Sequence, residues 1–310
     1  MSTHIIDSLE SQLNVVPDSQ ELLKILEKLK RQKLNIMFVG ATGVGKSSTI
    51  NSIFNMDVAK VGDRVDPETS TIQKFELDNI TLWDTPGLGD SPENDRRYAG
   101  EIAYALKERD ENGDLLIDEV VVLIDGSNRD MGTAYEVIEN MIAPLIGDPK
   151  RIVIAINQCD MAMKGRGWNH DLNLPEPSLV NFLDEKVRSV KARIAESTGI
   201  ETEPIYYSAL YHYNISKLLL TMLSSLPEGK RFLLADSMNK ESGIWKRNDD
   251  HKNYNQEIQK TMTGSLTKAV EGAAKGAVAG ATVGGLIPVI GPVVGAAVGA
   301  ALGFLGGLLD

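Results

Sequence analysis

The sequence has a single cysteine, Cys159, so it contains no internal disulfide framework. Its four histidines are scattered and lack the spacing of metal ligands. The N-terminus has no charged stretch followed by an apolar run, so we expect no secretory signal. These absences favour a reducing, cytoplasmic setting, in which Cys159 is interpreted as a small buried apolar residue and not as a nucleophile.

Positive charge is also scarce. The chain of 310 residues has 32 Lys and Arg against 43 Asp and Glu, which gives a formal net charge of −11. A broad nucleic-acid-binding surface needs clustered basic side chains. We therefore expect nucleic acid not to be the main partner.

Hydrophobic periodicity divides the chain into an N-terminal helical segment (1–32), a central domain (33–226), a polar connector with some helix (227–262) and an apolar tail (263–310). In the central domain, short apolar runs alternate with helical stretches, which indicates a doubly wound α/β fold. We predict a mostly parallel six-stranded sheet with helices on both faces. The predicted strands are 34–39, 72–77, 80–83, 119–124, 151–156 and 204–207, the second and third forming an antiparallel hairpin.

The first motif, GATGVGKS over 40–47, matches G-x-x-x-x-G-K-[ST] between an apolar strand and a helical run. Its glycines let the backbone wrap phosphates, and the following helix adds its positive N-terminal end. We expect Lys46 to reach the β- and γ-phosphates and the Ser47 hydroxyl to ligate Mg²⁺. The residues predicted to bind phosphate are Gly40, Ala41, Thr42, Gly43, Val44, Gly45, Lys46, Ser47 and Ser48.

A second motif, DTPG, follows the predicted hairpin. Asp84 ends an apolar strand and is expected to hold Mg²⁺ through a water, while the Gly87 amide could sense the γ-phosphate. Residues of about 56–71, which include PETST, are expected to form the first switch, and residues 87–97 the second. In the segment PETST, one hydroxyl should complete the Mg²⁺ shell. Motif spacing leaves the choice among the hydroxyls of Thr69, Ser70 and Thr71 open. We favour Thr69, with Thr71 second.

Two further loops predict the choice of base. Asp160, in NQCD, can accept from the N1–H and the exocyclic amine of guanine together, a donor pair that adenine lacks. Asn157 is expected to tie this loop to the phosphate loop, and Gln158 to lie over the base. In the segment Ser208, Ala209 and Leu210, the Ala209 N–H is expected to donate to the guanine carbonyl.

In this order, GATGVGKS, PETST, DTPG, NQCD and SAL resemble the five G motifs of the translation-factor-related P-loop GTPases. The set is similar to Era-like and septin/Toc-like members, and in particular to the bacterial YfjP-like, ribosome-binding-type group. The resemblance covers about residues 33–226. It implies a Ras-like G domain that binds GTP and GDP and uses Mg²⁺, with Lys46, Thr69 and Gly87 contributing to hydrolysis.

Three positions depart from that pattern. Gln158 stands where the family usually has lysine, which implies weaker nucleotide binding without loss of guanine specificity. Gly43 replaces the asparagine of potassium-activated relatives. Leu88 follows Gly87 where Ras-like proteins have the glutamine that orients water. We therefore expect slow intrinsic turnover, with the missing group supplied by a partner, by a homodimer across the nucleotide face, or by an arginine such as Arg96 or Arg97.

The tail has glycines at steps of four on both sides of a Pro/Gly turn, a pattern that predicts a glycine-zipper helical hairpin. Residues 289–309 have about the 20 residues that a membrane-spanning helix needs. Membrane association or insertion, self-assembly and packing on the chain's own G domain are all open. The glycines are Gly272, Gly276, Gly280 and Gly284, then Gly291, Gly295, Gly299, Gly303 and Gly307.

The sequence thus favours a GTP-hydrolysing switch that controls a membrane-acting or self-assembling tail. A ribosome- or RNA-associated assembly GTPase is an alternative, as is a nucleotide-binding module with negligible turnover, which Leu88 would suit.

Overall fold

A computed structural model describes residues 5–13, 20–56, 60–61, 72–89, 91–128, 131–250 and 252–276. Its strands are β1 (Leu34–Gly40), β2 (Lys60–Val61), β3 (Gln73–Leu77), β4 (Ile80–Asp84), β5 (Glu119–Asp125), β6 (Ile152–Asn157), β7 (Trp168–Asn169), β8 (Leu174–Pro175) and β9 (Ile205–Tyr206). The α-helices are α1 (Ile5–Leu13), α2 (Gln20–Leu29), α3 (Lys46–Ile53), α4 (Pro92–Lys107), α5 (Gly132–Val137), α6 (Ala143–Leu145), α7 (Pro177–Thr198), α8 (Ile215–Ser225) and α9 (Asn255–Gly276). Short helical turns of other types are η2 (Ile138–Ile142), η3 (Pro149–Arg151), η4 (Cys159–Gly165), η5 (Glu228–Ser237) and η6 (Ser242–Trp245).

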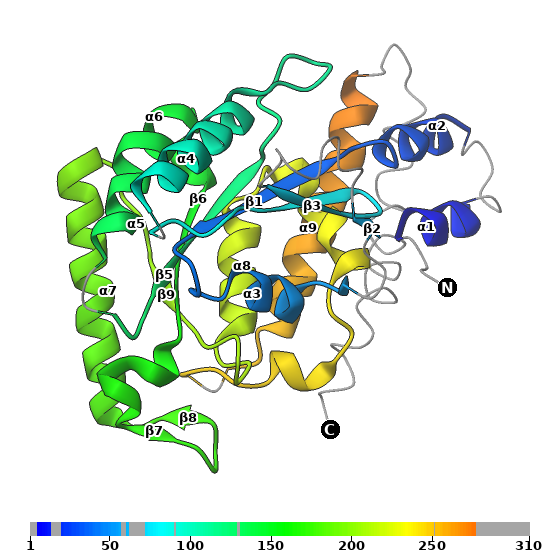
Figure 1. The fold of residues 1–310 in the computed structure, drawn as a ribbon. Helices are drawn as coiled ribbons and strands as arrows, with labels where there is room; N and C mark the ends of the chain where they lie inside the picture. Colours follow the sequence, from blue (N-terminus) through cyan, green and yellow to red (C-terminus); the bar gives the residue numbers. More distant parts are fainter. Residues whose placement is uncertain are drawn as a thin grey trace.

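Seven of the strands form one sheet in the order β2-β3-β4-β1-β5-β6-β9 (Figure 1). The pairs β4-β1, β1-β5, β5-β6 and β6-β9 are parallel, and β2 and β3 join antiparallel at one edge. The mostly parallel α/β fold predicted from the sequence is therefore confirmed.

The prediction of six strands was wrong by one. The additional strand, β2, lies in the stretch assigned to the first switch, and it pairs Lys60 with Glu76 and Val61 with Phe75. A strand of two residues has no alternation to detect, so its presence depends on the edge that β3 offers.

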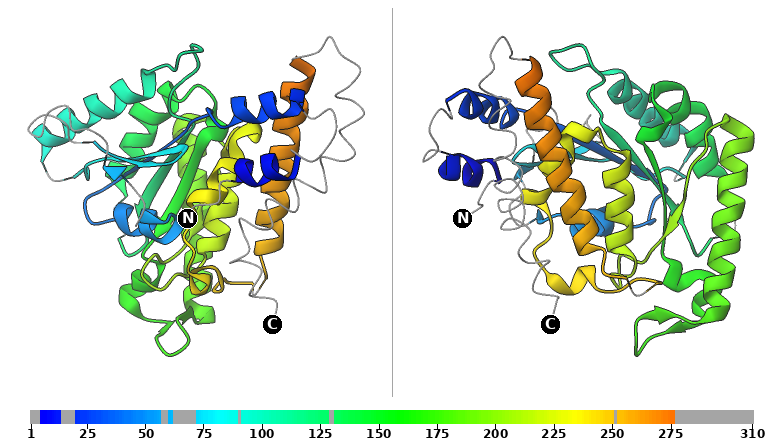
Figure 2. Two further views of the ribbon diagram at one scale, coloured as in Figure 1. Left: turned by 90° about the vertical axis from the view of Figure 1, so that its right-hand side faces the viewer. Right: turned by 180° about the vertical axis from the view of Figure 1, so that it is seen from behind.

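The sheet is covered on both faces, and this explains why most residues of β1 are apolar. Ile36 and Phe38 belong to the core on one face, while Met37 and Val39 belong to the core on the other. Helices α4 and α7 pack with the second core, and α3, α8 and α9 pack with the first (Figures 1 and 2). A strand buried on both faces is typical of a parallel sheet between helical layers.

The N-terminal helical segment, 1–32, forms two helices, α1 and α2, and α2 begins at Gln20. Helix α1 is held at its first turn because the Asp236 carboxylate accepts from the Ile5 backbone N–H at 3.0 and 3.1 Å. Lys30, after α2, pairs with Asp7 of α1 at 2.9 Å, so the two helices are joined to each other and to η5.

The segment 227–262, expected to be a polar connector, is part of the core. Phe232 and Leu234 of η5, Trp245 of η6 and Ile258 of α9 are all nearly fully buried. The boundary drawn at 262/263 falls inside α9, which runs without interruption from Asn255 to Gly276. Helix α9 lies beside α1 and α2, on the side of the molecule away from α7 (Figure 2).

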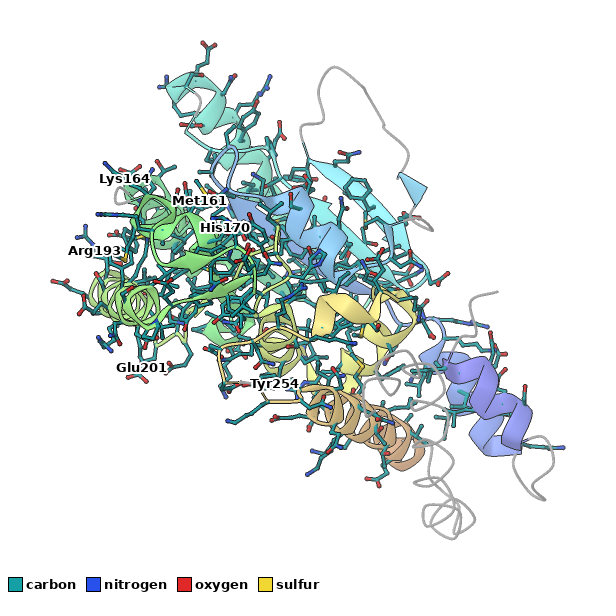
Figure 3. All side chains as sticks on the ribbon, turned by 90° about the horizontal axis from the view of Figure 1, so that it is seen from below. Met161, Lys164, His170, Arg193, Glu201 and Tyr254 are labelled. Atoms are coloured by element: carbon teal, nitrogen blue, oxygen red, sulfur yellow. The ribbon has the colours of Figure 1, made fainter. Side chains whose placement is uncertain are left out.

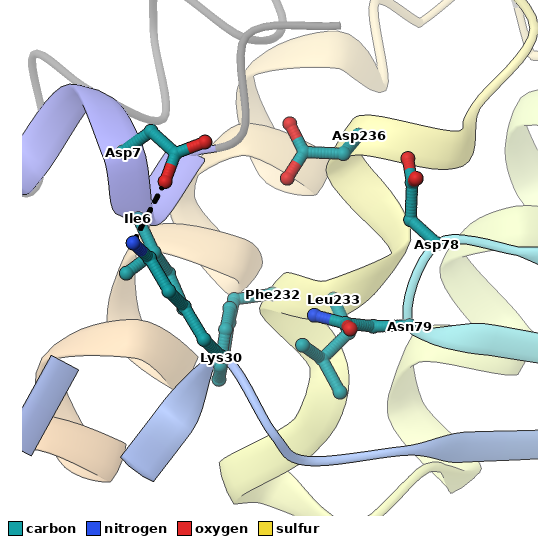
Figure 4. A pocket seen from close by; sticks show the side chains of 8 residues that line it. All are labelled: Ile6, Asp7, Lys30, Asp78, Asn79, Phe232, Leu233 and Asp236. Atoms are coloured by element: carbon teal, nitrogen blue, oxygen red, sulfur yellow. Dashed lines mark ion pairs between the residues drawn. The ribbon is translucent and has the colours of Figure 1, made fainter. Parts of the chain in front are cut away.

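A cavity of about 290 Å³ lies between α1, the end of α2, the β3–β4 turn and η5 (Figure 4). Asp78 and Asn79 of the turn, Lys30 and Asp236 are among its lining residues. The β3–β4 turn precedes β4, so this cavity is at the amino ends of the parallel strands. Ligands of open α/β sheets bind beyond the carboxyl ends, and this cavity therefore is not the nucleotide site.

Within the described residues, no helix has both the length and the apolar character needed to cross a membrane. Helix α9 carries the first two of the zipper glycines, Gly272 and Gly276. The rest of the predicted hairpin, 277–310, lies outside the described residues, as do the switch hydroxyls Thr69, Ser70 and Thr71.

Candidate nucleotide-binding site

The phosphate loop joins β1 to α3 in the geometry that its glycines permit. Gly43 and Gly45 have φ of 75° and 92°, in the left-handed region where a Cβ is strained. At Gly45 a Cβ would also lie 2.4 Å from Asn157 Nδ2, and at Gly40 it would lie 2.7 Å from the Leu123 carbonyl oxygen. The loop is therefore closed against its neighbours, and only glycine fits at these positions.

Lys46, at the first position of α3, folds back over this loop. Its Nζ donates to the carbonyl oxygens of Gly40 at 3.2 Å and Ala41 at 3.1 Å, and the side chain is buried. An ammonium group in this position is available to phosphate oxygens that enter the loop. The exposed Ser48 follows in the first turn of α3, where backbone N–H groups lack helical acceptors.

Ser47 and Asp84 meet at the carboxyl end of β4. The strand register sets Asp84 opposite Phe38, and the Ser47 hydroxyl donates to Asp84 Oδ2 at 2.8 Å. Asp84 Oδ1 is buried and has no hydrogen-bond partner in the described part of the chain. Burial raises the pKa of the Asp84 carboxyl above its ordinary value, opposed by the hydrogen bond from Ser47 and the charge of Lys46.

This pair fits a Mg²⁺ ion by its chemistry, because hydroxyl and carboxylate oxygens are the ligands that Mg²⁺ prefers. An orphaned carboxylate oxygen in a buried position is costly, and a cation would offset that cost. Thr69, the third predicted ligand, lies outside the described residues.

The start of the second switch is attached to the phosphate loop. The Thr42 N–H donates to the Leu88 carbonyl oxygen at 3.1 Å, and the Leu88 N–H donates to the Gly40 carbonyl oxygen at 3.3 Å. Gly87 is so close that a Cβ there would lie 2.4 Å from the Thr42 Cα. The Leu88 side chain is buried in the second core, so it is not directed toward a water at the phosphates.

The base loop begins where β6 ends and is tied to the phosphate loop by two amides. Asn157 Nδ2 donates to the Val44 carbonyl oxygen at 2.8 Å, and Gln158 Nε2 donates to the Gly43 carbonyl oxygen at 2.7 Å. Burial raises the pKa of the Cys159 thiol well above its ordinary value, which leaves it unreactive as expected.

Asp160 is buried, with 4% of its surface exposed. Its Oδ1 has no hydrogen-bond partner in the described ranges. A buried acceptor without a partner is rare in folded proteins and requires an explanation. A ligand that brings N–H donors to this loop would provide one.

The segment after β9 is attached to the base loop through a backbone amide. The Ala209 N–H, predicted to donate to the guanine carbonyl, donates to Asn157 Oδ1 at 3.0 Å in this structure. The Asn157 side chain donates through Nδ2 to the phosphate loop and accepts through Oδ1 from the segment after β9, so it connects the two. Ser208 is fully buried beside this contact, and Leu210, the next residue along, is 72% exposed.

Sequence analysis missed the support beneath the base loop. The Gly126 N–H donates to the Asn157 carbonyl oxygen at 2.7 Å, and a Cβ at Gly126 would lie 2.5 Å from that oxygen. Lys186 of α7 donates to the carbonyl oxygens of Gly126 and Asn128, both at 2.6 Å. No local motif marks these residues, because the contacts join segments far apart in the sequence.

These loops define a P-loop nucleotide-binding domain with a separate loop for the base. Residues 35–158 match the family model described as "50S ribosome-binding GTPase". That stretch is therefore similar to the P-loop GTPase domain that this model describes.

Curated relatives share the same region. The chain is 33% identical over 150 residues to "Uncharacterized protein YkfA" of Escherichia coli (strain K12), covering 46% of this chain and 48% of that protein. It is 28% identical over 173 residues to "Uncharacterized protein YfjP" of the same organism, covering 53% and 56%. A tRNA modification GTPase MnmE from Sulfurovum sp. (strain NBC37-1) is 27% identical over 168 residues, covering 52% and 35%. The chain thus spans about half the length, or less, of these relatives.

Two solved structures have low similarity to this chain. The "LeoA bacterial dynamin GTPase from ETEC" is 16% identical, covers 67% of this chain and 37% of its own, and has a TM-score of 0.40. A GTP-binding protein from Sulfolobus solfataricus in complex with GDP is 18% identical, covers 69% and 61%, and has a TM-score of 0.38. The fold assignment accordingly rests on the strand order and register of this chain.

The raised pKa of Asp84 gives a testable pH dependence. In the metal-free protein, the stability that Asp84 contributes is fully present below its ordinary pKa of 3.8 and is lost as pH rises through its raised folded value. We expect metal-free Asp84→Asn to be at least as stable as the native chain at neutral pH. The same variant should lose the added stabilisation by Mg²⁺ with GDP, which is about 2.7 kcal/mol at 100 times Kd.

Urea unfolding between pH 4 and 8, with and without MgGDP, measures both effects. Asp171→Asn, at an exposed carboxylate, is the matched control. A metal-free Asp84→Asn chain that is less stable than native at neutral pH, while retaining the full MgGDP effect, would contradict the assignment.

Proposed function

We propose that this protein is a guanine-specific GTPase that hydrolyses GTP slowly with Mg²⁺ and transmits its nucleotide state to its C-terminal part. The observation that carries the proposal is the buried Asp160 carboxylate, whose Oδ1 has no hydrogen-bond partner among the described residues. Asn157 fixes that loop beside the phosphate loop.

Guanine can supply donors to the Asp160 carboxylate, whose Oδ1 has no partner in the described part of the chain. Its N1–H and exocyclic amine point the same way and can both donate to one carboxylate. Adenine has an acceptor at N1 and a hydrogen at C2, so it would leave the carboxylate unpaired. A site built to bond polar groups rejects an analogue without them strongly, because its buried groups are then left without partners.

The base preference can be inverted by one substitution. Xanthine has a carbonyl at C2 in place of the amine of guanine. The side chain at position 160 must therefore donate a hydrogen bond to xanthine, whereas it accepts one from guanine. We expect Asp160→Asn to bind GDP about 10- to 100-fold more weakly, the loss of a charged hydrogen bond, and to gain affinity for XDP. Isothermal titration of both nucleotides on both chains measures this change. An unchanged ratio of GDP to XDP affinity would remove Asp160 from base recognition.

Hydrolysis is supported by the placement of Lys46, Ser47 and Asp84 around one loop. Mg²⁺, when bound, would neutralise charge on the β- and γ-phosphate oxygens. The buried apolar Leu88 favours slow turnover, since it can neither donate to nor accept from a water. Arg96 and Arg97, both exposed on α4, are candidates to complete the site from a partner copy.

Phosphate release measures the hydrolysis proposal. We expect a slow basal rate with Mg²⁺ that increases with protein concentration or with an activating partner, a contribution worth about 10³–10⁵-fold in related systems. Lys46→Ala should abolish the rate because it removes the cation closest to the phosphate loop. Native protein that binds GTP but releases phosphate no faster than Lys46→Ala would favour a binding module without turnover.

Contacts at the end of α3 support transmission to the C-terminal part. Phe54 forms an isolated bridge with Met238, and the Asn239 N–H donates to the Ile53 carbonyl oxygen at 2.8 Å. The Asn239 side chain also donates to the Asn51 carbonyl oxygen at 2.9 Å. The segment 237–239 is thus attached to the helix that follows the phosphate loop, immediately before the first switch.

That attachment continues to the tail through buried contacts. η5 packs along α9, and the Phe232 N–H donates to Ser265 Oγ at 3.2 Å. α9 then leads into residues 277–310, the segment proposed to associate with a membrane or with a second copy. A change at the phosphate loop therefore has a packed route to the base of the tail.

A shortened chain tests the tail. Because α9 is part of the core through Val270, the shorter chain should end at Gly276 and keep that helix whole. We expect both chains to bind GDP equally, because the nucleotide loops are unaffected. Only the full chain should float with liposomes or sediment as an oligomer. Liposome flotation and analytical ultracentrifugation measure these differences. If the full chain and the shorter chain behave alike in both measurements, a membrane or assembly role of the tail is refuted.

A further inference from the structure

A small hairpin stands between the base loop and α7. Strands β7 and β8 pair antiparallel, with Trp168 opposite Pro175 and Asn169 opposite Leu174. The hairpin is closed at its base, where the Glu176 N–H donates to the Gly167 carbonyl oxygen at 2.7 Å. It follows η4, the turn that contains Asp160, so it is the direct continuation of the base loop (Figure 1).

The hairpin contacts the second base-side loop through aromatic rings. The ring centroids of Trp168 and Tyr211 are 5.3 Å apart, and those of Trp168 and Tyr213 are 5.6 Å apart at 89°. His170 also approaches Tyr211, with its Nδ1 3.5 Å from the Tyr211 hydroxyl oxygen. Figure 3 looks onto the end of the molecule at which Figure 1 draws the hairpin, and it labels His170 and Met161. Two loops far apart in sequence are therefore joined by rings.

The loop that carries Tyr211 is closed on itself. The N–H groups of Ser208 and Tyr213 donate to each other's carbonyl oxygens at 3.1 and 3.0 Å, and the Tyr211 N–H donates to Ser208 Oγ at 3.3 Å. Ala209 lies within this closed loop and bonds to Asn157. A contact that fixes Tyr211 therefore also fixes the Ala209 N–H, which positions the Asn157 side chain.

We propose that the β7–β8 hairpin is a brace for the base pocket, in which Trp168 and Tyr211 act as positioning residues that fix the Asp160 loop against the 208–213 loop. The proposal rests on the guanine-binding function proposed above and adds residues outside the recognised motifs. Both loops would flank a bound base, since one carries the Asp160 carboxylate and the other carries the exposed Leu210. Losing the ring contact would let the loops separate.

The brace acts mainly on the base. The phosphate loop has contacts of its own to Leu123 and Leu88, and neither contact involves the hairpin rings or the 208–213 loop. A loosened base pocket should therefore release GDP faster without weakening a phosphate-only ligand. Affinity changes among variants of one site appear mainly in the dissociation rate.

The test measures GDP dissociation from the full chain by displacement of fluorescently labelled GDP. We expect Tyr211→Ala and Trp168→Leu to release GDP about 3- to 10-fold faster, the effect of one lost aromatic pair. Tyr211→Phe keeps the ring and should behave nearly as native. Leu172→Ala, at a side chain 63% exposed on the hairpin, is the matched control and should change nothing.

Two further titrations distinguish a brace from general destabilisation. The ratio of GDP to ADP affinity should fall in Tyr211→Ala, while the affinity for inorganic pyrophosphate should stay native. If the native chain shows no preference for GDP over ADP, the proposed function fails first. If the native preference is present but Tyr211→Ala keeps it and the native release rate, or weakens GDP, ADP and pyrophosphate equally, the brace is refuted. Should Tyr211→Ala fail to fold, Trp168→Leu with Tyr211→Phe gives the same comparison.

Discussion

The side-chain amide of Asn157 is the contact on which the nucleotide edge depends. It donates to the Val44 carbonyl oxygen at 2.8 Å and accepts from the Ala209 N–H at 3.0 Å, so one buried group joins the phosphate loop to the segment after β9. Parallel strands bring their carboxyl ends to one edge, but they do not fix the loops to each other. An aspartate here would lose the donor, and a leucine would leave both partners unsatisfied at a cost of about 1–3 kcal/mol each.

Motifs whose chemistry is local in sequence were predictable from the residues alone. The glycine pattern of the phosphate loop sets its own backbone, and Asp84 ends β4, which pairs with β1. The acceptor of the Ala209 N–H was not predictable. That acceptor, Asn157 Oδ1, lies at the end of another strand, and only the tertiary structure brings the two groups together. The Trp168–Tyr211 contact was missed for a related reason, since the two rings come from different loops with no shared spacing.

The C-terminal region shows a different limit of sequence reasoning. Charged and polar side chains, above all those of residues 246–252, gave 227–262 the composition of a connector. The buried residues Ile258, Met262, Leu266 and Val270 recur at every fourth position and place α9 in the core. The helices at both ends of the described chain are thus packed on the G domain, and the contact of Met238 with Phe54 links them to the helix that follows the phosphate loop.

The central claim is that one edge of this sheet selects a guanine nucleotide through a buried carboxylate. Calorimetric titration of the full native chain with GDP and with ADP, at equal Mg²⁺, tests it most directly. The account predicts that GDP binds about 100-fold or more tightly than ADP, as expected of a site that hydrogen-bonds a polar edge. Equal affinity for the two nucleotides would contradict it.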